Sequence, residues 1–166
     1  EDEVECEVTV DDGALSATAS ETIDIFEQPD WGAIQFPCSQ TATASTSFDV
    51  YGRVYMGGVT DGSGMGAGIL GEAGIGPDGS DPSSDLTGWT FTAGAYNGDL
   101  GNDDEYKASL TAPGTAGDYD VAWRFSADGG LSWIYVDQHS SCGAGLTGYT
   151  DGYSAANSTP LTVTSP

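Results

Sequence analysis

Two short stretches of the sequence concentrate the oxygen-bearing side chains that a calcium ion prefers. Calcium takes about six to eight oxygen ligands, which closely spaced carboxylates, amides and backbone carbonyls on glycine-containing loops supply. Neither stretch has the ligand spacing of an EF-hand, and Asp, Asn, Gly and Ser also form ordinary turns. In the second stretch, neighbouring oxygen donors would repel one another without a cation, which makes it the better candidate. The candidate ligands are Asp78 and Asp81 in the first stretch and Asp99, Asn102, Asp103 and Asp104 in the second.

Aromatic side chains carry the second chemical signal, because sugars bind proteins by stacking their C–H faces on Trp and Tyr rings. Trp133 and Tyr135 are two residues apart on one predicted strand and share a face, so both pack inward or both form a platform. Burial is favoured for this pair, because each ring contributes a large apolar area. Tyr149 and Tyr153 lie in a glycine-rich loop and are expected to be the more exposed pair. These four residues are the candidate ligand-binding residues.

Catalytic chemistry finds little support in the residue types. A Ser or Cys nucleophile needs an adjacent base, and the one histidine, His139, lies in a polar loop with no nucleophile motif around it. Carboxylate pairs hydrolyse glycosides only in a cleft that holds two of them at a defined separation. Among 26 Asp and Glu, the presence of such pairs carries no information. No catalytic residue is assigned, and we expect the chain not to be an enzyme.

The charge balance excludes several classes of partner. The 166 residues include 26 Asp and Glu but three Lys and Arg, which gives a formal net charge of -23. Binding to nucleic acid or to an anionic membrane surface requires the basic residues that this chain lacks. No apolar run approaches the ~18 residues of a membrane span, so we expect no membrane insertion. Abundant Gly, Ser and Thr with almost no Lys are typical of a secreted or extracellular surface protein.

Three cysteines, Cys6, Cys38 and Cys142, stand at spacings that match neither a zinc ribbon nor a thioredoxin-like motif. In an oxidising compartment they predict one disulfide and one remaining thiol. That thiol could pair with another chain or with sequence outside this segment.

The elements that must position these residues are predicted to be strands. Runs rich in Val, Ile, Thr, Tyr and Phe recur between clusters of Gly, Asp, Asn and Ser, and no segment has a sustained helical period. We therefore expect an all-β fold with minimal helix, and the spacing favours a two-sheet antiparallel immunoglobulin-like β-sandwich over a barrel. The clearest strands are Ser47 to Met56, Gly88 to Ala93, Glu105 to Thr111, Gly117 to Ser126, Leu131 to Asp137 and Pro160 to Thr164. Weaker strands are Val4 to Val10, Thr22 to Phe26, Gly32 to Phe36 and Ala67 to Ala73.

Alternation and turn chemistry predict how these strands are arranged. The apolar, core-facing side of one strand consists of Tyr119, Val121, Trp123 and Phe125, and Trp31 is also assigned to the core. Glycine-containing turns at residues 112–114 and 128–130 are expected to join Glu105 to Asp137 into a three-strand meander. Residues 57–86 are expected to be long loops around one short strand. Residues 1–30 form an acidic extension that is a candidate for an added edge strand, and residues 31–166 form the sandwich module.

Several motifs resemble a known module. In chain order they are Trp31-Gly-Ala-Ile-Gln-Phe-Pro, Val50-Tyr-Gly-Arg-Val-Tyr with Gly58-Val-Thr-Asp, Gly76-Pro-Asp-Gly-Ser-Asp-Pro, Tyr96-Asn-Gly-Asp-Leu-Gly-Asn-Asp-Asp-Glu-Tyr and Phe125-Ser-Ala-Asp-Gly-Gly-Leu-Ser-Trp. Together they resemble a β-sandwich module that accompanies secreted bacterial hydrolases, including amylase-type and pullulanase-type enzymes and extracellular nucleases, or stands in surface proteins. The match covers about Trp31 to Val163. The resemblance implies a non-catalytic, immunoglobulin-like accessory module.

The resemblance also implies a pairing for the cysteines. Such modules carry one Cys just after the first strand's Pro and another near the end of the Trp-x-Tyr strand, and Cys38 and Cys142 fit this pattern best. The implied Cys38–Cys142 bridge closes a loop of roughly 100 residues and leaves Cys6 as the odd thiol. Because Cys142 lies several residues later than the pattern requires, Cys6–Cys38 is the alternative.

Taken together, the residues and the resemblance predict a binding or accessory module whose expected ligand is a polysaccharide. The alternative is a structural surface or assembly protein, stabilised by a disulfide and by calcium. Such a protein would self-associate through Cys6 or through an exposed edge strand.

Overall fold

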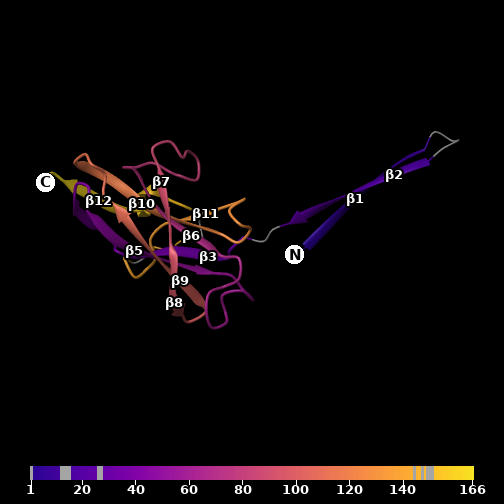
Figure 1. Ribbon diagram of the computed structural model, residues 1–166, viewed down its shortest axis with the longest axis horizontal. Coiled ribbons are helices and arrows are strands. Elements are labelled where there is room, and N and C mark those ends of the chain that lie inside the picture. Colours follow the sequence, from indigo (N-terminus) through magenta and orange to yellow (C-terminus); the bar gives the residue numbers. More distant parts are fainter. Residues whose placement is uncertain (1, 12–15, 26–27, 144, 147, 149–151) are drawn as a thin grey trace.

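The computed structural model describes residues 2–11, 16–25, 28–143, 145–146, 148 and 152–166 (Figure 1). Two sheets pack face to face and form the predicted immunoglobulin-like β-sandwich. The four-stranded sheet has the order β3 (Trp31–Phe36), β5 (Ser47–Tyr55), β9 (Asp103–Thr111), β8 (Ala95–Leu100). The six-stranded sheet has the order β4 (Gln40–Thr43), β12 (Thr159–Thr164), β10 (Gly117–Ser126), β6 (Leu70–Pro77), β7 (Thr90–Ala93), with β11 (Ile134–Val136) also pairing with β10.

The core lies between the sheets and is built on alternation along β10. Val121, Trp123 and Phe125 are fully buried, which confirms the predicted core-facing side. The rings of Trp123 and Phe125 stack with centroids 5.5 Å apart. Gly52 on β5 makes room for them, because a Cβ atom there would come within 2.6 Å of the Trp123 ring. Ala122 is buried as well, so the outer side of this central strand is also covered.

The glycine-rich region after residue 57 contains a central strand, whose predicted bounds are wrong. The predicted short strand Ala67 to Ala73 is the longer β6, which runs to Pro77 between β10 and β7. Its glycines obscure the apolar pattern, yet they have a packing role. A Cβ atom at Gly76 would lie 2.1 Å from the Trp89 ring, and one at Gly74 would lie 2.7 Å from the Phe91 ring. The sequence also misses β4 and β8.

The predicted three-strand meander is half correct. β10 and β11 form an antiparallel hairpin around the Asp128-Gly129-Gly130 turn, as expected. β9, however, pairs with β5 and β8 in the other sheet, so the Pro113-Gly114 turn carries the chain from one sheet to the other. Turn residues determine that a chain reverses, but packing determines whether the next strand pairs or crosses over.

The N-terminal segment forms a sheet of its own. β1 (Asp2–Asp11) and β2 (Ser16–Ile25) pair antiparallel with each other, and Figure 1 shows this hairpin as an element separate from the sandwich. Neither strand is hydrogen-bonded to an edge strand of the sandwich. The division of the chain at residue 30 stays a prediction. Helix is limited, among the described residues, to short turns such as the 3₁₀ turn Ala155–Asn157, and none of it is long and apolar enough to cross a membrane.

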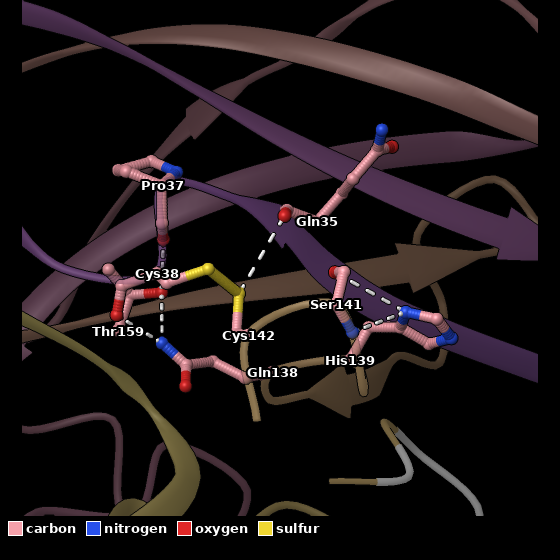
Figure 2. The surroundings of a disulfide bond; sticks show 8 residues. All are labelled: Gln35, Pro37, Cys38, Gln138, His139, Ser141, Cys142 and Thr159. Carbon is pink, nitrogen blue, oxygen red and sulfur yellow. Dashed lines mark hydrogen bonds between the residues drawn. A yellow bond between two sulfur atoms is a disulfide. The ribbon is translucent and has the colours of Figure 1, made fainter. Parts of the chain in front are cut away.

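A disulfide joins Cys38 to Cys142, with Cα atoms 5.2 Å apart (Figure 2). This confirms the bridge that the resemblance implies. It ties the segment after β3 to the loop that follows β11. Gln138 reinforces the same junction, because its side-chain amide donates hydrogen bonds to the Cys38 carbonyl at 2.6 Å and to the Thr159 hydroxyl at 3.2 Å.

Candidate functional site

The predicted pair Trp133 and Tyr135 lies on the outer face of the six-stranded sheet, not in the core. Tyr135 is paired in register with Arg124, whose neighbours Trp123 and Phe125 point inward. The Arg124 guanidinium lies 4.1 Å from the Phe91 ring centroid and 4.3 Å from the Trp133 ring centroid. The expectation of inward packing is therefore wrong. Both residues are nevertheless partly covered, and the guanidinium occupies one face of the Trp133 ring.

Arg124 is fixed in this position by charge and hydrogen bonds. Its Nη2 atom lies 2.6 Å from a carboxylate oxygen of Glu72 on β6, and its Nη1 atom donates to the Tyr135 hydroxyl at 3.3 Å. A half-buried, hydrogen-bonded ion pair stacked on aromatic rings is stronger than an exposed one. This face is consequently a packed stack of side chains rather than an open platform.

The other two predicted tyrosines are placed differently from each other. Tyr153 packs edge-on against Trp89, with ring centroids 6.4 Å apart. Its hydroxyl is buried without a hydrogen-bond partner among the described residues, and burial raises its pKa. Tyr149 lies outside the described residues. Tyr153 is thus less exposed than the sequence predicts.

The better predicted calcium stretch is a strand pair joined by a short turn that contains Asn102. Asn97 and Asp99 lie in β8, and Asp103 and Asp104 lie in β9. Because successive residues point to opposite faces of a sheet, Asp104 is buried on the inner side, whereas Asp103 lies beside Arg53 on the outer side.

The carboxylates of this pair contact a glycine-rich loop. Asp99 accepts a hydrogen bond from the Gly64 amide at 3.0 Å, and Asp104 accepts one from the Gly66 amide at 2.7 Å. In the part of the chain that the structure describes, no group of three or more His, Cys, Asp or Glu residues is arranged to hold a metal ion.

The first calcium stretch forms a turn with local hydrogen bonds. Asp81 accepts bonds from the Ser83 amide at 2.8 Å and from the Ser83 hydroxyl at 2.7 Å, and Asp78 is exposed. Asp120 on β10 joins this turn by accepting a bond from the Gly79 amide at 2.7 Å. These are the turn contacts expected of Asp and Ser.

A cleft of about 740 Å³ lies where the two sheets end side by side. β7 is the last strand of its sheet, and β8 pairs with β9 only as far as Lys107. The end of β9 therefore has no partner strand on that side, and the gap between the sheets opens to solvent. The polar residues of its lining are Thr90 and Thr92 on β7, the edge of β9 at Ser109 and Thr111, the acids Asp78 and Asp118, and Tyr119.

The outer face of the four-stranded sheet carries aromatic and basic residues that the sequence analysis missed. Tyr51, Arg53 and Tyr55 alternate with the buried residues Val50 and Val54 on β5. The signal was present, because assigning Val50 and Val54 to the core places the odd-numbered residues Tyr51, Arg53 and Tyr55 on the opposite side of the strand.

Trp31 belongs to this outer face too, which corrects its assignment to the core. It lies half-buried on β3, directly opposite Tyr55 in the strand register. Its neighbour Gly32 is the residue that points inward, toward Phe125 and Val136.

An immunoglobulin-like β-sandwich with an open inter-sheet cleft and aromatic outer faces is the class of protein that these features define. No family model matches the sequence. The chain is 33% identical over 99 residues to an amylopullulanase from Thermoanaerobacterium thermosulfurigenes. The match covers 52% of this chain and 5% of that protein, so the similarity concerns a small part of a much larger molecule.

Proposed function

We propose that this chain is a non-catalytic, secreted or cell-surface accessory module that binds a neutral polysaccharide in the inter-sheet cleft. The observation that carries the proposal is the cleft itself. Its volume of about 740 Å³ lies within the range of roughly 300–1,000 Å³ that is usual for ligand sites. Two other hollows among the described residues are smaller, at about 460 and 290 Å³.

The lining of the cleft suits a hydroxyl-rich ligand. Thr90 and Thr92 on β7 bring hydroxyl groups, which both donate and accept hydrogen bonds, and the end of β9 adds its backbone edge at Ser109 and Thr111. Tyr119 adds a half-buried ring whose own hydroxyl donates to a backbone carbonyl at 3.0 Å. Sugars need this combination of an apolar surface with a few fixed polar groups.

The net charge restricts the polysaccharide to a neutral one. At -23, the molecule repels acidic polymers over a distance of about 10 Å or more at low salt. The similar protein is named an amylopullulanase, an enzyme whose name denotes action on amylose and pullulan, and both are neutral glucans. The small fraction of that protein which is matched supports an accessory role over a catalytic one. The disulfide supports an oxidising, extracellular location.

Retention on insoluble amylose and affinity electrophoresis in pullulan test the proposal. We expect the protein to be retained, and the double variant Thr90→Val with Thr92→Val to bind at least about tenfold more weakly, because two hydrogen-bonding groups are lost without loss of volume. Trp133→Ala is the matched control on the outer face of the six-stranded sheet and should bind like the wild type.

Three outcomes would contradict the proposal in different ways. Loss of retention in Trp133→Ala alone would move the site to the aromatic face that the sequence predicts. Unchanged retention of the double variant would exclude the cleft as the polysaccharide-binding site. A wild-type protein that neither glucan retains, and that sediments as a dimer, would favour the assembly alternative instead.

A further inference from the structure

We propose that a second, smaller hollow, on the outer face of the four-stranded sheet, binds a single neutral pyranose unit. The hollow has a volume of about 290 Å³ and is lined by Trp31, Arg53, Tyr55, Asp103 and His139. It lies on a different face from the inter-sheet cleft. The class of ligand, a neutral sugar, follows from the proposed function. The location of the site follows from the geometry of the hollow.

Three neighbouring strands build the floor of this hollow. Trp31 on β3 pairs with Tyr55 on β5, and Val54 pairs with Asp104 on β9. Asp103 therefore lies next to Tyr55, and the three outward residues form one row across the sheet. Side chains on paired strands are held more precisely than side chains on loops.

Arg53 supplies hydrogen-bond donors that the described residues leave largely unused. Its guanidinium lies 5.4 Å from the Trp31 ring centroid, and its Nη1 atom lies 3.6 Å from an Asp103 carboxylate oxygen. That separation is too long for a hydrogen bond. Its Nε atom is buried without a hydrogen-bond partner among the described residues. Because Nε is covered, the Nη atoms are the donors that the guanidinium can offer to oxygen atoms of a ligand.

The disulfide holds the remaining wall in place. His139 packs edge-on against Trp31, with ring centroids 5.5 Å apart, and its amide donates to the Ile34 carbonyl of β3 at 3.1 Å. The adjacent segment ends in Cys142, which is bridged to Cys38. Figure 2 shows His139 and Ser141 beside this bridge, and the Ser141 amide donates to Nδ1 of His139 at 3.2 Å.

The residues that line the hollow carry opposing charges, although Asp61 and Asp30 beside the Tyr55 hydroxyl add negative charge and raise the pKa of Tyr55. Burial, together with the Arg53 charge, lowers the pKa of His139, so its ring is uncharged at pH 7. Among the lining residues, the charges that remain are those of Arg53 and Asp103, which oppose each other. A ligand that fits must offer oxygen atoms to the guanidinium and hydroxyl groups to the carboxylate. Neutral sugars do both.

The size of the hollow limits the ligand to one sugar ring. At about 290 Å³ it lies at the lower end of the range for ligand sites, whereas the cleft has room for several units. We therefore infer that this hollow recognises a free sugar or a chain end, and that the cleft recognises the interior of a chain.

Titration of the ¹⁵N-labelled protein with glucose and maltose, followed by two-dimensional NMR, tests the inference. The four tryptophans give separate indole signals, and the Trp31→Phe spectrum assigns that of Trp31. We expect the Trp31 indole signal and the His139 amide signal to shift with a dissociation constant of about 1 mM. Glucuronate should bind at least about tenfold more weakly, because the protein repels its carboxylate.

Variants separate a binding role from a structural one. Trp31→Ala and Arg53→Gln should each weaken binding by at least about tenfold, whereas Trp31→Phe keeps a ring and should retain most of it. Trp133→Ala is the matched control and should bind normally. The amide spectrum of each variant reports whether it is folded.

The two proposals can fail separately. The proposal that the hollow binds a sugar would be wrong if the Trp31 and His139 signals did not shift. It would also be wrong if glucuronate bound equally well, or if a folded Arg53→Gln protein bound glucose normally. Shifts confined to Thr90 and Thr92 would also contradict the proposal for the hollow, but they would support the cleft. If the Trp31 signal shifts but insoluble glucans do not retain the protein, the proposed sugar site in the hollow is supported and polysaccharide binding in the cleft is rejected.

Discussion

Two neighbouring acids on β9 have different environments, one partly exposed and one buried, and this difference affects their pKa values. Asp103 lies on the outer side of β9 beside Arg53, whereas Asp104 is fully buried with its Oδ1 atom unpartnered among the described residues. Burial raises the pKa of Asp104, and the nearby carboxylates of Asp99 and Asp103 raise it further. The Gly66 amide opposes this rise by donating to Oδ2.

At the scale of single residues, we predict that Asp104→Asn raises the melting temperature by a few degrees at pH 7. The folded-state pKa of Asp104 lies above its unfolded value, so its protonated form contributes stability below the unfolded pKa. That contribution is lost as the pH rises through the folded pKa. Asparagine keeps the acceptor for Gly66 without the buried charge, so the gain should shrink when both proteins are melted near pH 3.5.

Asp99→Asn is the control for this prediction. Its hydrogen bonds from the Tyr96 hydroxyl and the Gly64 amide lower the pKa of Asp99, so removing its charge should not stabilise the protein. Melting with calcium and with a chelator completes the test. If calcium raises the melting temperature of the wild type but not that of Asp104→Asn, then Asp104 is a cation ligand, as the sequence suggests, and the prediction is wrong.

At the scale of elements, the loop after β11 is held from two sides. Asp137 accepts a backbone hydrogen bond from Ile34 on β3 at 2.7 Å, and the Gln138 amide donates to the Asn157 carbonyl at 3.0 Å. The Cys38–Cys142 bridge then closes the loop. Because the hollow takes His139 from this loop and its other residues from strands, the disulfide supports both the fold and the shape of that hollow.

We predict that the double variant Cys38→Ser with Cys142→Ser loses up to about 4 to 5 kcal/mol of unfolding free energy. The bridge spans 104 residues, and in the chain-entropy model a loop of that length restricts the unfolded chain strongly. Urea denaturation measures the loss. Cys6→Ser is the control and should match the wild type. A double variant as stable as that control would show that the backbone bonds alone hold the loop.

At the scale of the whole molecule, the charge of -23 is a property of the folded surface that the few basic residues scarcely reduce. Each of the three is already engaged with a carboxylate. Lys107 lies 2.7 Å from Asp49, Arg124 lies 2.6 Å from Glu72, and Arg53 lies 3.6 Å from Asp103. The remaining acids therefore repel one another in the compact state.

We predict that the melting temperature rises when sodium chloride is increased from about 10 mM to about 500 mM, because salt screens repulsion between surface charges. Potassium chloride should give the same rise at equal ionic strength, since screening does not depend on the cation. A melting temperature that falls with salt would show that attractive ion pairs dominate over repulsion.

Local regularities were predicted from the sequence where a single strand determines them. The alternation of Val121, Trp123 and Phe125 follows from the period of two in any extended chain, and the Asp128-Gly129-Gly130 turn follows from the conformations that glycine allows. The all-β class followed from many such runs. The Cys38–Cys142 bridge came from the resemblance, not from spacing.

Only the tertiary structure determined which strands are neighbours and which outer faces are covered. It placed β9 and β10 in different sheets, made β6 a central strand, and put Trp31 and Trp133 on opposite outer faces of the sandwich. Alternation divides the side chains of a strand between two faces, but it does not say which face meets the core when both carry aromatic residues. That choice depends on the packing of distant strands, and it is why both proposed sites consist of residues that the sequence did not bring together.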